Sequence, residues 1–146
     1  MTHDDIILIG KRWLSKQRYI APNHFSGTKQ IATEVTTISN EIADVIGWHE
    51  WGQVSTLIEC KTSRSDFLAD QKKPFRMRPD EGMGQYRFYL SPIGIIKERD
   101  LPDKWGLLET DGKAIYVVRA SEVFTFNWKS ERALLISLWR RAKEGK

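Results

Sequence analysis

The amino-acid sequence predicts an α/β fold of the mixed α+β type, in which a central mixed β-sheet is flanked by helices. Segments rich in β-branched and aromatic residues lie between residues 31 and 61 and again between residues 85 and 118. Amphipathic segments of helical period lie at both ends of the chain, and a shorter one separates the two strand regions. This order of helix, meander, helix, strand, hairpin and helix is typical of one sheet with helices packed on it.

The first helix is predicted over residues 4–16. Apolar residues follow one side of this segment, and cations lie near its C-terminal end, where the helix dipole favours them. Thr2 or Asp4 could cap its start. A stretch that contains Pro22 and Gly27 then predicts a loop over residues 21–28.

Three strand segments follow, and short turns join them. The strands are predicted over residues 31–38, 41–48 and 54–61. The turns are predicted at Ser39-Asn40 and Trp51-Gly52-Gln53. Because connections this short join antiparallel neighbours, we expect an antiparallel meander.

The second half of the chain is predicted to begin with a helix over residues 65–73, which Ser65 could cap and Pro74 ends. The polar stretch over residues 76–84 predicts a mobile loop. A strand over residues 85–90 follows, and Asp111-Gly112 predicts the turn of a hairpin. The hairpin strands and the final amphipathic helix are predicted over residues 106–109, 114–118 and 130–143.

Length and composition narrow the class of protein. A chain of 146 residues with 40% hydrophobic residues fits one domain over residues 1–146. The sequence has no apolar run of membrane length and no signal segment, and its one cysteine, Cys60, cannot form an internal disulfide. We therefore expect a cytoplasmic protein with no membrane partner. The net charge of +4 is compatible with nucleic acid as a partner, and no P-loop, nucleophile elbow, dinucleotide fingerprint or zinc spacing is present.

One group of polar residues in the meander carries the functional prediction. Asp44 lies in an apolar strand segment, where a carboxylate is costly unless something pairs with it. Glu59 and Lys61 are two residues apart in the next strand, so they should project from the same face, with Cys60 opposite. Because a short turn joins the two strands, Asp44 and Glu59 should lie close enough to share one ion.

Two carboxylate oxygens suit Mg²⁺ or Mn²⁺, and the backbone carbonyl of Cys60 could add a ligand. Such an ion polarises a phosphate and lowers the pKa of a bound water. Lys61 could orient that water or stabilise charge on the phosphate. The alternative is an ion pair between Glu59 and Lys61, with Asp44 as a carboxylate near the turn.

The segment from Asp44 to Lys61 resembles the D-x(n)-E-x-K core of the PD-(D/E)-x-K nuclease superfamily. The run from Glu59 through Asp70 and Lys72 also resembles the E-x-K-x-S-x-x-D-F-x-x-D-x-K stretch of its MmcB-like bacterial and phage branch. The segment beginning at Pro102 is similar to a later strand of that branch. The resemblance implies a restriction-endonuclease-like sheet, Asp44 and Glu59 as metal ligands, and Lys61 as the catalytic lysine.

The sequence departs from the superfamily pattern at two places. Ala43 precedes the aspartate, at a position where many members have a proline. Many members also carry an acidic residue on the first helix, whereas Asp4 and Asp5 lie at the very start of this helix. Glu34 or Glu41 could supply the additional carboxylate. We prefer Glu34 as this metal ligand, because its strand should pair with that of Asp44, although it could equally be a solvated strand residue.

Basic and hydroxyl-bearing residues follow the E-x-K motif and could hold backbone phosphates. These predicted nucleic-acid contacts are Ser63, Arg64, Ser65, Lys72, Lys73 and Arg76. The alternative is a solvated helix face. Asp66 and Asp70 are expected to have structural roles, binding Lys73 or Arg64.

Gln85 and Tyr86 are two further candidates for DNA contact, because they begin the strand after the predicted loop. The alternation of Tyr86, Phe88 and Leu90 is more often the core face of a strand. Taken together, the patterns predict a Mg²⁺- or Mn²⁺-dependent nuclease that acts on DNA in a bacterial or phage-infected cell, with homodimerisation possible. The alternatives are a protein of the same fold that grips DNA without cutting it, and a phage factor that blocks a host defence protein.

Overall fold

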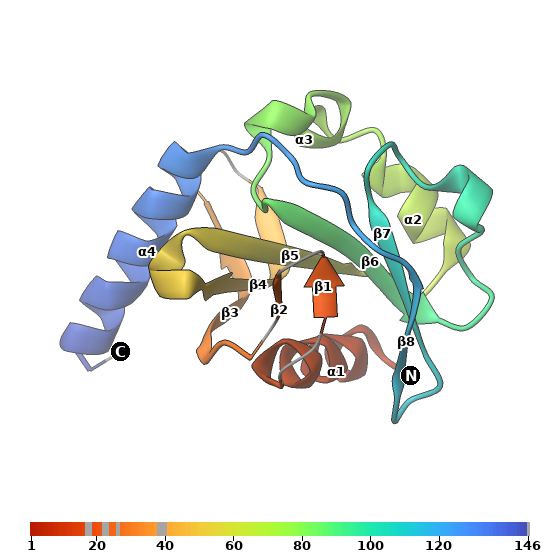
Figure 1. Cartoon of the computed structure of the whole chain (residues 1–146), viewed down its shortest axis with the longest axis horizontal. Helices are drawn as coiled ribbons and strands as arrows, with labels where there is room; N and C mark the ends of the chain where they lie inside the picture. The colour runs from red at the N-terminus through yellow and green to blue at the C-terminus, as the bar shows by residue number, and fades with distance from the viewer. Residues whose placement is uncertain (17–18, 22–23, 26, 38–40, 146) are drawn as a thin grey trace.

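The computed structural model describes residues 1–16, 19–21, 24–25, 27–37 and 41–145. Within these residues, a six-stranded mixed sheet has the order β3-β4-β5-β6-β7-β8, and helices flank it on both faces (Figure 1). Strands β1 (Tyr19–Ala21) and β2 (His24–Phe25) form a separate two-stranded antiparallel sheet. The predicted mixed α/β fold class is therefore confirmed.

Helix α1 (His3–Ser15) begins with a capping box. The Thr2 hydroxyl accepts a hydrogen bond from the Asp5 backbone N–H at 3.1 Å, and the Asp5 carboxylate accepts one from the Thr2 N–H at 2.8 Å. Two of the unpaired donors at the helix start are thereby satisfied, so Thr2 is the cap. Ile6 and Leu14 on the inner side of the helix are fully buried against the sheet.

The predicted antiparallel meander is confirmed. Strands β3 (Gln30–Thr36), β4 (Ile42–His49) and β5 (Val54–Cys60) pair antiparallel, and the short helix η1 (Glu50–Gly52) turns β4 into β5. The predicted end of the first strand at Ile38, the turn at Ser39-Asn40 and part of the predicted loop over residues 21–28 lie outside the described residues. Residues 24–25 of that predicted loop form β2 instead.

In the second half of the sheet, the strand pairing changes from antiparallel to parallel. Strand β6 (Tyr86–Pro92) runs parallel to β5, and β7 (Gly106–Thr110) runs parallel to β6 after the short helix η3 (Glu98–Asp100). Strand β8 (Ile115–Arg119) pairs antiparallel with β7 across the predicted Asp111-Gly112 turn. Gly112 has a φ of 104°, which glycine adopts without the steric cost that a Cβ would bring.

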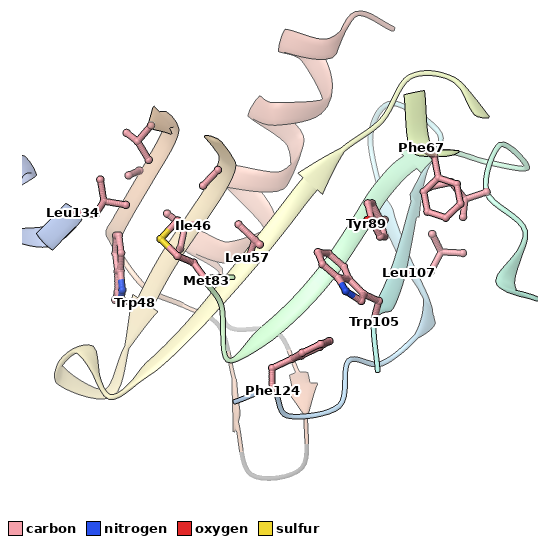
Figure 2. Packing of buried hydrophobic residues seen from close by; sticks show 14 residues of the cluster. Ile46, Trp48, Leu57, Phe67, Met83, Tyr89, Trp105, Leu107, Phe124 and Leu134 are labelled. Atoms are coloured by element: carbon pink, nitrogen blue, oxygen red, sulfur yellow. The ribbon is translucent and has the colours of Figure 1, made fainter. Parts of the chain in front are cut away.

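Apolar residues pack in two layers, one on each face of the sheet. The layer under α1 contains Ile58, Cys60 and Phe88, as expected for side chains that alternate along β5 and β6. The opposite layer contains Leu57 and Tyr89 from the same strands together with residues of two helices (Figure 2). There the rings of Tyr89 and Trp105 stack with centroids 4.4 Å apart, and Phe67 meets Tyr89 edge-on at 4.9 Å. This second layer borders the candidate site.

The segment between β5 and β6 differs from the prediction. Helix α2 (Arg64–Asp70) is capped by Ser63, whose hydroxyl accepts a hydrogen bond from the Asp66 N–H. The predicted cap at Ser65 is therefore wrong. Helices α3 (Pro74–Met77) and η2 (Pro79–Glu81) occupy most of the predicted mobile loop over residues 76–84. Met83 is fully buried, and burial of this side chain fixes the segment against the sheet.

Helix α4 (Trp128–Lys143) lies on the sheet face opposite α1, and a single carboxylate anchors it. Buried Glu131 accepts hydrogen bonds from the Trp48 indole at 3.1 Å, the Ser55 hydroxyl at 3.0 Å and the Gly84 N–H at 2.8 Å. Because these donors come from β4, β5 and the segment just before β6, Glu131 fixes the start of α4 against this part of the sheet. Among the described residues, no helix has the length and apolarity required to cross a membrane.

Candidate functional site

Asp44 and Glu59 lie at opposing backbone positions, one step beyond the last pair of the ladder between β4 and β5. The last paired residues are Val45 and Ile58, so the next position of the same register joins Asp44 to Glu59. Beyond that point β5 pairs with β6 alone, and the Cys60 N–H donates to Asp44 Oδ2 at 2.8 Å. The His3 imidazole lies 3.4 Å from the same oxygen. The predicted proximity of the two carboxylates across adjacent strands is therefore present.

Glu59 is the most enclosed member of this group. Its side chain is 2% exposed, and its Oε1 atom lies 3.2 Å from Nη2 of Arg76. Neither atom has a hydrogen-bond partner within the described residues, so the pair is held by charge and not by an aligned hydrogen bond. Burial raises the pKa of Glu59 well above its ordinary value; Arg76 opposes this rise, and the nearby carboxylates of Asp44 and Asp70 add to it.

Arg76 lies at the centre of a buried charge cluster, which we define as Arg76 with Glu41, Glu59 and Asp70. Its guanidinium lies 2.9 Å from Asp70, 3.2 Å from Glu59 and 3.5 Å from Glu41, and its side chain is 2% exposed. It also stacks 4.8 Å from the centroid of the Trp105 ring. A guanidinium enclosed in this way cannot reach a phosphate, so the prediction that Arg76 contacts nucleic acid is wrong.

Asp70 connects Lys61 to the buried charge cluster. Its carboxylate accepts hydrogen bonds from the Tyr89 hydroxyl at 2.6 Å and from Arg76 Nε at 2.9 Å. The amines of Lys61 and Lys73 lie 3.2 Å and 3.0 Å from its other oxygen. Burial acts to raise the pKa of Asp70, but the charges of Arg76 and Lys61 outweigh it, and the pKa is far below its ordinary value. The expected structural role of Asp70 and its contact with Lys73 are confirmed.

The two candidates for an additional carboxylate occupy different surroundings. Glu41 is fully buried, accepts from the Met83 N–H at 2.9 Å and faces Arg76. Glu34 lies on β3 opposite Asp44, as expected, but it is exposed, and its carboxylate forms a surface group with His3 and Asp4 within 4.8 Å. Its role as a metal ligand stays a prediction.

Of the residues around α2 that are predicted to contact nucleic acid, some are exposed and others already have a structural partner. Ser65 and Lys72 are exposed, whereas Arg64 pairs with Asp100 at 2.7 Å, and not with Asp66 or Asp70. Ser63 serves as the helix cap and Lys73 pairs with Asp70. The contacts of these residues with DNA stay predictions.

Gln85 and Tyr86 lie at the other end of the strands. Tyr86 pairs with Thr56 at the start of β5, three positions before Glu59 in the same register. It is 5% exposed and packs in one apolar layer with Phe88 and Leu90, as the core alternative predicts. The core alternative for Tyr86 is therefore confirmed, and the contacts of Gln85 and Tyr86 with DNA stay predictions.

The central place of Arg76 is the feature that the sequence analysis missed. A usable signal was present, because Glu41, Asp44 and Glu59 all lie in apolar strand segments and buried carboxylates require a buried cation. The sequence alone did not indicate which of the many cations downstream would supply that charge.

The donor set of this site suits a hard divalent cation. Both described contacts of Asp44 fall on Oδ2, which leaves Oδ1 for a ligand. Glu59 Oε1 forms no hydrogen bond among the described residues, although Arg76 Nη2 lies 3.2 Å from it. Carboxylate oxygens of this kind fit Mg²⁺ or Mn²⁺. Asp44 and Lys61 retain side-chain exposures of 12% and 11%, so one edge of the site is open to solvent.

Comparison with known proteins supports the fold but assigns no activity. No protein-family model matches the sequence, and no curated protein matches it significantly. A solved structure of a protein of unknown function from Silicibacter pomeroyi is similar, with a TM-score of 0.58 and 23% identity, over 77% of this chain and 76% of that chain. At this identity the likeness shows that the two chains share a fold.

Proposed function

We propose that this protein is a divalent-metal-dependent nuclease that hydrolyses phosphodiester bonds in DNA. The observation that carries the proposal is the opposition of Asp44 and Glu59 at the point where β4 and β5 separate, with Lys61 two residues further along the chain. This arrangement agrees with the PD-(D/E)-x-K pattern of the sequence. The proposal assigns the protein to the cytoplasm of a bacterium or a phage-infected cell, where DNA is accessible.

In this proposal, Asp44 and Glu59 hold Mg²⁺ or Mn²⁺, with Glu34 and the Cys60 carbonyl as further candidate ligands. The ion would polarise the phosphate and neutralise its charge. Lys61 would stabilise the charge that develops on the phosphate, because its amine is held by Asp70 and remains partly exposed. Asp70 would act as a positioning residue for this lysine.

The metal would also relieve an unfavourable arrangement of charge. Burial is the main cause of the raised pKa of Glu59, and Asp44 and Asp70 add to the rise, while Arg76 and Lys61 oppose it. A divalent cation beside Glu59 would favour its ionised form. Metal binding is therefore expected to strengthen with rising pH.

The proposal is tested by pairing a cleavage assay with a metal-binding assay. Asp44→Asn, Glu59→Gln and Lys61→Met are compared with the exposed controls Glu122→Gln and Lys97→Met on supercoiled and single-stranded DNA with Mn²⁺. We expect all three site variants to lose at least about 100-fold in cleavage rate. Titration of Mn²⁺ followed by electron paramagnetic resonance should show weaker binding for the first two variants only. Cleavage that survives Asp44→Asn and Glu59→Gln in folded protein would reject the site.

A second candidate function is a protein of the same fold that binds DNA or a host protein without cutting. The ion pair between Glu59 and buried Arg76 favours it, because a cation already lies beside this proposed metal ligand. This candidate predicts partner binding that is insensitive to a chelator, together with no cleavage by the wild type in Mn²⁺ and no metal binding at Asp44.

A further inference from the structure

The outward face of α4 carries a stripe of alternating apolar and cationic side chains, which we call the α4 stripe. Its members are Trp128, Arg132, Ile136, Trp139 and Lys143. Their spacing of three or four residues aligns them along one side of the helix. Trp128, Ile136 and Trp139 are 51%, 49% and 61% exposed, so about half of each side chain is accessible to a partner.

Cations lie over the rings of both tryptophans of the stripe. The Arg132 guanidinium is 4.7 Å from the centroid of Trp128, and the Lys143 amine is 4.9 Å from the centroid of Trp139. Contacts of this kind restrict ring rotation and so order the exposed aromatic surface. Lys129 lies 5.7 Å from the centroid of Trp128 as well, and the two tryptophans remain 51% and 61% exposed, so part of each ring is accessible to a planar group.

The charge of this helix is strongly one-sided. Lys129, Arg140 and Arg141 add to the cations of the stripe, whereas the acidic residue within the helix, Glu131, is buried against the sheet. Within the described residues, none of the helix cations forms an ion pair with a carboxylate, in contrast to Arg76. The exposed face of α4 therefore presents positive charge to a partner.

A groove lies beside the stripe, between α4 and β3. Two hollows of about 880 Å³ and 540 Å³ share four lining residues, Lys29, Gln30, Trp48 and Leu135. The first hollow reaches Trp51 in the turn between β4 and β5, and the second reaches Trp139. Trp51 is fully exposed and has a φ of 60°, a left-handed conformation that is a steric outlier for a bulky residue.

We infer that the α4 stripe and the adjoining groove bind single-stranded DNA. Exposed indole rings stack on unpaired bases, whose faces are inaccessible inside a duplex, and the neighbouring cations complement the phosphate backbone. An acidic protein would pair with the cations but would offer no planar groups for the tryptophans to stack on. A second copy of this chain would place its own stripe cations next to those of the first copy, and like charges repel. The choice of DNA over RNA rests on the proposed function; the single-stranded, stacking mode of binding does not.

The dimensions of the surface agree with an oligonucleotide. Sixteen residues of α4 rise about 22 Å from Trp128 to Lys143, a length that accommodates several nucleotides of an extended strand. Glu131 places the N-terminal end of α4 over the start of β5, and the groove follows β3, whereas Asp44 and Glu59 lie where β4 and β5 separate. Binding measured in EDTA therefore tests the α4 stripe apart from cleavage.

The test measures fluorescence anisotropy of a labelled twelve-nucleotide oligo(dT) in EDTA, so that cleavage cannot contribute. Trp139→Ala and Trp128→Ala are compared with Tyr116→Ala, a matched change of an exposed aromatic residue on β8, far from α4 in Figure 1. We expect each tryptophan variant to weaken binding at least about fivefold and the control to leave it unchanged. Arg132→Gln should also flatten the salt dependence of binding, whereas Lys97→Gln should not.

Four outcomes would overturn the inference. These are equal binding of oligo(dT) by wild type and tryptophan variants, a duplex of the same length that competes as well as oligo(dT), polyglutamate that competes equally, and a change of oligomeric state in Trp139→Ala. Oligo(rU) that competes better than oligo(dT) would overturn the choice of DNA. Wild-type protein that binds through the stripe but never cuts in Mn²⁺ would reject the proposed catalysis alone, and cleavage without stripe binding would reject this inference alone.

Discussion

Arg76 and Arg132 make nearly the same local contact and have opposite surroundings. Each guanidinium stacks on a tryptophan, at 4.8 Å from Trp105 and 4.7 Å from Trp128 respectively. Arg76 is buried among Glu41, Glu59 and Asp70, whereas Arg132 is exposed on α4 and has no carboxylate partner within the described residues. The aromatic contact therefore does not indicate the role of an arginine, and the carboxylates around it do.

The difference has an energetic reason. A buried guanidinium has lost its hydration, so it is stable only where carboxylates and hydrogen bonds replace the water. An exposed guanidinium keeps its hydration and can exchange water for a phosphate at little cost. The buried charge cluster is thus expected to contribute to folding and to the geometry of Glu59, and the α4 stripe to contribute to binding.

The largest expected effect on stability comes from replacing the buried arginine, Arg76. Arg76→Met would leave Glu59, Asp70 and Glu41 without their shared cation, and we expect it to lower the free energy of unfolding by about 3–5 kcal/mol. Arg132→Met is the matched control and should change it by no more than about 0.5 kcal/mol. Urea titrations at pH 7 measure both. Equal losses of unfolding free energy in Arg76→Met and Arg132→Met would show that the carboxylates around Arg76 do not make it more important for stability than Arg132.

The next effect concerns Asp70 and has a defined pH dependence. Asp70→Asn should cost about 2–3 kcal/mol at pH 7, because three charge-assisted contacts and the Tyr89 hydrogen bond weaken. The folded-state pKa of Asp70 is lowered, so its contribution is complete above the unfolded pKa of about 3.9 and is lost as the pH falls toward the folded value. The difference between wild type and variant should therefore shrink below about pH 4. Asp103→Asn, an exposed control, should show no such trend.

Glu59 should give a smaller effect with the opposite sign. Its folded-state pKa is raised, so the folded protein holds the proton more tightly, and this group loses stability as the pH rises above the unfolded value of about 4.3. Over the first pH unit above about pH 5, wild-type stability should fall relative to Glu59→Gln by at most about 1.4 kcal/mol. A difference that is flat with pH would contradict the raised pKa, and Glu122→Gln provides the exposed reference.

The smallest expected effect on stability comes from replacing an exposed tryptophan of the α4 stripe. Trp139→Ala should change the free energy of unfolding by no more than about 0.5 kcal/mol, because the side chain is 61% exposed and alanine favours the helix. Thermal and urea unfolding measure it directly. Ala133→Gly in the same helix is the positive control and should cost about 1 kcal/mol. A loss for Trp139→Ala larger than this control would assign the tryptophan a packing role.

The order of elements was accessible from the sequence because local chemistry determines it. The Thr2 cap, the three-stranded meander and the Asp111-Gly112 turn each depend on residues near one another in the chain. The opposition of Asp44 and Glu59 was accessible for the same reason, because one short turn sets their register. The ordered segment over residues 74–83 was not, because burial of Met83 and Arg76 depends on contacts with distant strands.

By itself, the sequence determined which residues alternate along the strands and which carboxylates lie in apolar segments. Only the tertiary structure decided which cation neutralises those carboxylates. Arg64, Lys72, Lys73 and Arg76 all follow the E-x-K motif closely, yet the chain encloses Arg76 beside Glu41, Glu59 and Asp70 and leaves Lys72 in solvent. The physical reason is that the cost of burying a charge depends on every group around it, and here those groups come from α2, α3, β5 and the residue that precedes β4.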